Sequence, residues 1–79
     1  MKKVSVLGVD LAKNVFQLHG VDHKGRATLT RRVHREQLLK IIGELAPCLI
    51  GIEASTGAFY WQRQFEKLGH TVKIVARNT

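Results

Sequence analysis

The chain has 79 residues, enough for one small domain, and its 44% apolar content is too high for a disordered segment. Lys and Arg outnumber Asp and Glu by 13 to 6, and the resulting net charge of +7 favours polyanions such as nucleic acid as partners. A single cysteine rules out an intrachain disulfide, and no run approaches the ~20 apolar residues that cross a bilayer, so we expect a soluble cytoplasmic protein with no membrane partner.

The first half of the sequence predicts three strands joined by tight turns. Val4–Val9 is apolar on both pleat faces, as in a central strand that is covered on both sides. Val15–Val21 is a second strand, and the turn residues Asp22–Gly25 lead into a third, Arg26–Val33. Apolar residues alternate with Arg and Thr in this third strand, which suits the edge of a sheet. Together the three segments predict an antiparallel meander.

A helix and a short buried strand follow. Apolar residues between Arg35 and Leu45 fall on one stripe, which predicts a helix that Pro47 ends. Cys48–Glu53 is then an apolar strand, and we expect Cys48 to be a core residue.

The last part predicts a second helix and a fifth strand. Ser55 is the expected N-cap of a helix over about Thr56–Leu68, and Gly69 stands where a C-terminal cap belongs. Thr71–Ala76 is the final strand. The stripe predicted to be buried on this helix holds Ala58, Trp61, Phe65 and Leu68, with Phe59 also expected in the core.

The element order βββαβαβ predicts an α/β fold with a mixed five-stranded sheet. The first three strands are antiparallel neighbours, and the two later strands, each reached through a helix, are expected to run parallel. This is the topology of the first five strands of the RNase H-like (RuvC-type) fold. Other small α/β sheets share it, so topology alone leaves the fold family open.

Two strand ends carry the same pattern of a glycine followed two residues later by an acid. Gly8-Val9-Asp10 closes the first strand, and Gly51-Ile52-Glu53 closes the fourth. If these strands are parallel neighbours, both carboxylates emerge side by side, and at a few ångströms they repel by about 4 kcal/mol at an effective dielectric of about 20. A raised pKa of one acid would offset this repulsion, and so would a bound cation. Oxygen ligands at an open site favour Mg²⁺ or Mn²⁺ as that cation. The alternative is that one acid begins a turn and the other caps a helix or pairs with a lysine.

Three segments of the chain resemble the DEDD transposases of bacterial insertion sequences, a group of recombinases that includes pilin-invertase-like proteins. The segments are GVDLAKNVFQLHG (8–20), CLIGIEASTGAFYW (48–61) and LGHTV (68–72). The resemblance implies a RuvC-like domain that binds Mg²⁺ or Mn²⁺ through four acids in the order Asp, Glu, Asp, Asp. Asp10 matches the first of these acids and Glu53 the second. It also implies DNA as substrate and, in many members, a guide RNA.

The chain departs from the pattern of this family beyond these three segments. The family's third and fourth acids, and a separate domain with a nucleophilic serine, follow later, whereas no acid follows Glu66 here. Glu66 sits mid-helix beside Lys67 and is most simply a solvated charge. We therefore expect residues 1–79 to be a truncated RNase H-like domain that binds metal weakly, cleaves DNA barely or not at all, and self-associates through uncovered apolar surface.

Five basic residues are candidate nucleic-acid contacts, because Lys and Arg supply affinity for phosphates whatever the base sequence. Four of them are predicted to form a basic cluster on and after the edge strand, and the fifth stands near Asp10. They are Arg26, Arg31, Arg32, Arg35 and Lys13. A solvated sheet edge explains the four arginines equally well, and Lys13 equally suits a phosphate contact or a counter-charge to the acids.

Two other functions remain as alternatives. The first is a non-catalytic basic module that binds DNA or another protein. The second is a fragment of an actin-like ATPase, because Gly8-Val9-Asp10 also resembles the phosphate-binding opening of that fold. The second is disfavoured, since Ala12 and Lys13 stand where a glycine and a Ser or Thr are expected.

Overall fold

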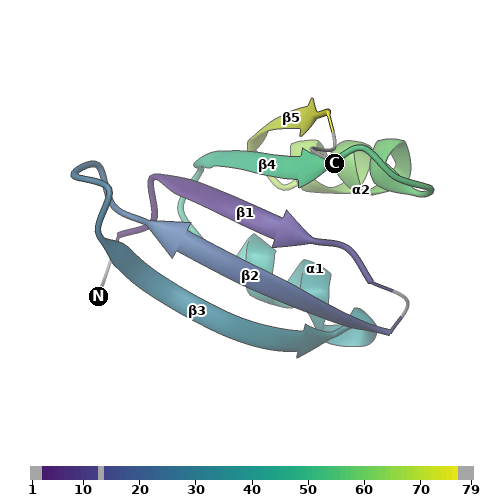
Figure 1. The fold of residues 1–79 in the computed structure, drawn as a ribbon, viewed down its shortest axis with the longest axis horizontal. Helices are drawn as coiled ribbons and strands as arrows, with labels where there is room; N and C mark the ends of the chain where they lie inside the picture. Colours follow the sequence, from purple (N-terminus) through teal and green to yellow (C-terminus); the bar gives the residue numbers. More distant parts are fainter. Residues whose placement is uncertain (1–2, 13, 77–79) are drawn as a thin grey trace.

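The computed structural model describes residues 3–12 and 14–76, which form one sheet and two helices (Figure 1). The elements follow in the predicted order: β1 (Val6–Asp10), β2 (Val15–Val21), β3 (Ala27–His34), α1 (Arg35–Gly43), β4 (Leu49–Glu53), α2 (Ala58–Lys67) and β5 (Thr71–Val75). Neither of these helices is long and apolar enough to cross a membrane.

The five strands form a single mixed sheet in the order β3-β2-β1-β4-β5. β1 and β2 are antiparallel, as are β2 and β3, while β4 runs parallel to both β1 and β5. The predicted meander and the two later parallel strands are thus confirmed. The arrangement is that of an α/β half-domain compatible with the RNase H-like fold.

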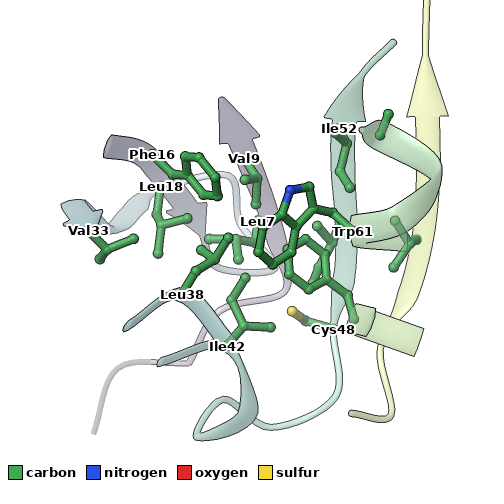
Figure 2. Packing of buried hydrophobic residues seen from close by; sticks show 14 residues of the cluster. Leu7, Val9, Phe16, Leu18, Val33, Leu38, Ile42, Cys48, Ile52 and Trp61 are labelled. Atoms are coloured by element: carbon green, nitrogen blue, oxygen red, sulfur yellow. The ribbon is translucent and has the colours of Figure 1, made fainter. Parts of the chain in front are cut away.

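Both helices pack on one face of the sheet, where a single hydrophobic core forms (Figures 1 and 2). Alternate residues of the strands point into it, since side chains of a strand alternate between its faces. Trp61 of α2 lies at its centre, edge-on to Phe16 of β2 with ring centroids 5.4 Å apart. The other buried members are Leu7, Val9, Leu18, Val33, Leu38, Ile42, Cys48, Ile50, Ile52, Ala58, Phe65 and Val72.

The opposite face of the sheet carries no helix among the described residues, so one prediction about β1 was wrong. The strand was expected to be covered on both faces, yet Val6 is 41% exposed, whereas Leu7 and Val9 are buried. The apolar residues on both faces of β1 indicated a central position correctly, because β1 lies in the middle of the sheet. They did not indicate which faces are covered. We call this uncovered side of the sheet the open face.

The second helix begins later than predicted, and its cap is different. Gly57 is its N-cap, with a φ of 91° that side chains rarely adopt, and the Ser55 hydroxyl instead donates to the Glu53 carbonyl at 3.3 Å. Phe59, one residue into the helix, is 69% exposed and Leu68 is 39% exposed, so both were wrongly predicted as core. At the other end of the helix, Gly69 has the left-handed backbone (φ 100°) that the sequence predicted there.

Buried His70 links the first helix to the start of the fourth strand. Its Nδ1 accepts the Cys48 backbone N–H at 3.1 Å, so its proton lies on Nε2, which donates to the Ile42 carbonyl at 2.8 Å. The Cys48 Sγ lies 3.6 Å from the same Nδ1, and burial raises the pKa of this thiol. Cys48 is therefore a core residue, as predicted.

Candidate metal and nucleic-acid site

The two candidate metal ligands lie side by side at the ends of neighbouring parallel strands. β1 and β4 pair with Val9 opposite Ile52, so Asp10 and Glu53 occupy the next position on each strand. Because Val9 and Ile52 point into the core, the two acids project from the open face, where both are exposed. They also line one common cavity of about 320 Å³ together with Gly8, His19 and Val75.

The sheet places polar residues next to the acids on the open face. The strand register sets five residues in one line across the sheet, in the order Arg32, Gln17, Asp10, Glu53 and Val75. A second cavity, of about 440 Å³, lies beside this line and is bounded by Asp10, Gln17 and Arg32 among others. A guanidinium and a side-chain amide therefore share a cavity with the first acid.

Asp10 and Glu53 supply a donor set of two carboxylates. Mg²⁺ is commonly held in this way, by one or two carboxylates, with water and substrate phosphates completing its shell. No group of three or more His, Cys, Asp or Glu side chains with metal-binding geometry occurs within residues 3–12 and 14–76. Glu66 lies on the exposed side of α2, outside both cavities. The residues fit a partly hydrated ion at an open site.

The four arginines do not form a single cluster. Arg26 precedes β3 at the end of the sheet opposite Asp10, where its Nε lies 3.3 Å from an Asp22 carboxylate oxygen. Arg31 is in register with core-facing Leu18 and is therefore on the helix side of β3. Arg32 projects from the open face and lines the cavity that contains Asp10.

The fourth arginine lies against an aromatic residue of the second helix. Arg35 begins α1, and its guanidinium lies over the Trp61 ring, 5.2 Å from the centroid. The fifth basic candidate, Lys13, lies outside the described residues. Of the four candidate arginines, Arg32 is thus the one that the structure brings beside an acid of the site.

Three residues near the acids were not predicted as parts of the site. His19 lines the cavity with Asp10 and Glu53, Gln17 is the register partner of Asp10, and Lys73 is the register partner of Gly51 on β5. Strand alternation shows which face each residue occupies, but not which residues of other strands lie beside it. The register was needed to find them.

Comparison with known proteins identifies relatives that cover nearly all of this chain. It is 44% identical over 73 residues to a probable family 20 transposase of Pseudomonas aeruginosa, a match that covers 92% of this chain and 22% of that protein. It is 40% identical over 76 residues to the transposase for insertion sequence element IS1111A of Coxiella burnetii, covering 96% of this chain and 21% of the relative. The transposase for insertion sequence element IS1328 of Yersinia enterocolitica is 34% identical over 76 residues, and this match covers 96% of this chain and 23% of that protein.

The chain therefore spans about a fifth of the length of the curated relatives it matches. No family model matches the sequence, and no solved structure matches it.

Proposed function

Because this chain is homologous to insertion-sequence transposases over 92–96% of its length, we propose that it forms the part of a transposase catalytic domain that carries the first two metal-binding acids. The observation that most directly supports this proposal is the parallel pairing of β1 with β4, which sets Asp10 and Glu53 at adjacent strand ends on one face. The α/β topology, compatible with an RNase H-like half-domain, and the net charge of +7 support DNA as the substrate.

In this proposal the two carboxylates hold Mg²⁺ or Mn²⁺ next to a phosphodiester of the DNA. The bound ion supplies charge neutralisation at the phosphate and activation of water. Asp10 and Glu53 orient the ion from the sheet, while Arg32 and Gln17 provide hydrogen-bond donors beside Asp10. The adjacent glycines, Gly8 and Gly51, leave room for a phosphate backbone to approach.

Strand cleavage and transfer require more than this segment. Two acids complete only half of the four-acid set that the resemblance implies. We propose that the remaining acids lie in other parts of the relatives' length, together with any determinants of guide RNA binding or of assembly. We therefore expect weak metal binding and no detectable DNA cleavage from these 79 residues alone.

The metal site is tested by titrating Mn²⁺ into the ¹⁵N-labelled chain, because this paramagnetic ion broadens the amide signals near its binding site. We expect the signals of residues 8–11 and 51–54 to broaden first. Asp10→Asn and Glu53→Gln should each abolish this selective broadening, since without substrate phosphates the ion depends on both carboxylates.

Glu66→Gln is the matched control, because it removes the same charge from the exposed side of α2. It should leave the broadening unchanged. Broadening that survives in Asp10→Asn, or that centres on another acid such as Asp22, would contradict the proposed site.

The net charge of +7 favours a second candidate, a basic module that binds DNA without chemistry. Such binding depends on phosphate neutralisation and falls steeply with salt. A mobility-shift assay with and without Mg²⁺ separates the two. Binding that neither Mg²⁺ nor Asp10→Asn changes, in a chain without selective Mn²⁺ broadening, would favour the second candidate.

A further inference from the structure

A second line of residues crosses the open face directly beside the acids. The pairings of all five strands place these residues at one level of the sheet, in the order Thr30, His19, Gly8, Gly51 and Lys73. They lie two residues before Arg32 on β3, Asp10 on β1, Glu53 on β4 and Val75 on β5, and two residues after Gln17 on β2. This second line therefore runs parallel to the line that contains the acids.

The centre of this line is open space, and the register positions on its two sides hold His19 and Lys73, whose side chains carry hydrogen-bond donors. A Cβ at Gly51 would meet nothing within 4 Å, and one at Gly8 would meet only the His19 carbonyl, at 3.7 Å. His19 lines the cavity of about 320 Å³ that contains both glycines and both acids. Lys73 is exposed on the far side of Gly51, so the two glycines lie between an imidazole and an ammonium group.

The chemistry of the two flanking side chains matches phosphate oxygens. A lysine ammonium carries three N–H donors and no acceptor, and an imidazole keeps at least one N–H donor in either protonation state. Three strand spacings of about 4.8 Å separate β2 from β5, so the backbone positions of His19 and Lys73 lie about 14 Å apart across the sheet. Successive phosphates of one strand of a duplex are ~3.4 Å apart when measured along the helix axis, so a span of this size covers more than one phosphate.

The lines on either side of this one offer no comparable site for a polyanion. One contains Asp10 and Glu53, whose carboxylates repel phosphate unless a cation lies between them. The other contains Val21, Val6 and Leu49, which are apolar. The line with the two glycines combines open space with a donor residue on each side of it and contains no carboxylate.

We propose that one nucleic-acid strand crosses the sheet over Gly8 and Gly51, with His19 and Lys73 as the residues that bind its phosphates. This inference deepens the proposed function and rests on it, because it places the strand beside the acids that would hold the metal. The phosphates are bound through charge and hydrogen bonds, so the proposed phosphate-binding site accepts DNA and RNA alike.

The test measures binding of labelled single-stranded DNA and RNA oligonucleotides of one mixed sequence by fluorescence anisotropy, in EDTA and at several salt concentrations. Lys73→Ala should weaken binding about five- to tenfold and reduce the salt slope by about 0.7, the value for one phosphate contact with a single strand. His19→Ala should weaken binding severalfold, while His19→Asn, which keeps an N–H donor, should retain more of it.

Lys67→Ala is the matched control for charge, because Lys67 lies in the last turn of α2 on the helix side of the molecule. It should leave both the affinity and the salt slope nearly unchanged. Equal losses for Lys73→Ala and Lys67→Ala would overturn the proposal, since the total charge would then explain binding. An effect confined to DNA or to RNA would overturn the assignment to phosphates.

Steric block provides an independent test. Gly51→Leu fills space that is empty around this residue and should weaken binding at least tenfold, whereas Thr71→Leu adds bulk on the same face outside the line of glycines and should not. Circular dichroism melting checks that each variant folds. Gly51→Leu that folds and binds normally would overturn the proposed path.

All of these measurements exclude divalent ions. Failure of the metal site therefore leaves this result unaffected, and failure of the strand path leaves the Mn²⁺ broadening unaffected.

Discussion

His70 shows how one buried polar side chain joins three elements of this fold. Its ring accepts the Cys48 N–H at the start of β4 and donates to the Ile42 carbonyl in α1, while the residue itself leads into β5. Both ring nitrogens are thereby satisfied, and no buried side-chain nitrogen or oxygen in the described part of the chain lacks a partner. The sequence motif that contains His70 signalled relatedness but gave no indication of this role.

Truncation of this residue should cost the domain a large part of its stability. His70→Ala leaves a buried N–H and a buried carbonyl unpaired, each worth about 1–3 kcal/mol, so we expect a loss of about 3 kcal/mol. For a domain of this size, that lowers Tm by about 12–24 °C. The measurement is urea unfolding followed by circular dichroism, with His23→Ala, in the exposed turn, as the control that should change little.

The Cys48 thiol gives a second readout of the same substitution. Burial raises its pKa and limits access, so alkylation of the native chain should be slow. In His70→Ala the rate of Cys48 alkylation should rise, because the start of β4 opens more often. A variant with unchanged stability and an unchanged alkylation rate would mean that this histidine merely fills space.

At the scale of single elements, the turn between β2 and β3 was predicted correctly, and the hydrogen bonds that form it join residues close in sequence. Asp22 Oδ1 accepts the backbone N–H groups of Lys24 and Arg26, each at 2.9 Å, and Gly25 adopts a φ of 81°. Such a turn needs an acceptor at its first position and a glycine that tolerates positive φ, and both are visible in the sequence.

The start of α2 was predicted less well, because two local signals competed. Ser55 has the side chain preferred at an N-cap, but the helix begins after Gly57, whose left-handed backbone changes the chain direction. Phe59 was assigned to the core together with the helical stripe, but it is 69% exposed, and the buried stripe consists of Ala58, Trp61 and Phe65. Helix periodicity gave the correct element and core partners, but neither the cap nor the exposure of its first turn.

The hairpin turn makes the stability of the meander depend on pH. Hydrogen bonds from the Arg26 and Lys24 backbone, with the Arg26 side chain and His23, hold the pKa of Asp22 below 3.8 despite some desolvation. A folded pKa below the unfolded value stabilises the fold above about pH 4, and this contribution is lost as the pH falls through the lowered folded value. Asp22→Asn should therefore be less stable than the native chain at pH 7 and nearly equal to it in strong acid.

Urea unfolding at pH 7 and near pH 2 measures this difference. Glu66→Gln serves as the control, because it removes the same charge from the exposed side of α2. If the two variants behave alike, the net charge of the domain, rather than the turn, sets the pH dependence.

At the scale of the whole molecule, sequence pattern gave the topology and the position of the acids but not the distribution of basic charge. Glycine–acid repeats at two strand ends required only that those strands be parallel neighbours, which β1 and β4 are. The arginines were predicted as one cluster because they are close in sequence, whereas alternation sends Arg31 and Arg32 to opposite faces. The positions of His19 and Lys73 beside the acids depend on strand register. Apolar alternation fixes the face of each residue but does not exclude a shift of two residues.

The open face and the net charge act in opposite directions on self-association. Val21, Val6 and Leu49 lie side by side on that face, and burying them against a second copy would remove apolar surface from water. Two copies with a charge of +7 each repel, and salt screens this repulsion, with a Debye length of about 10 Å at 0.1 M. We therefore expect association to strengthen as salt rises, opposite to the expected salt dependence of nucleic-acid binding.

Analytical ultracentrifugation at low and high NaCl measures this directly. The native chain should be mainly monomeric at about 0.05 M salt and increasingly dimeric near 0.5 M, since the Debye length falls severalfold over this range. Val6→Lys should abolish the dimer by placing a charge among the apolar residues, whereas Gln37→Lys adds the same charge on exposed α1 and should reduce it only slightly. If both variants weaken the dimer equally, general repulsion controls association. A chain that stays monomeric at high salt and high concentration would show that the apolar line on the open face is too small to hold a second copy.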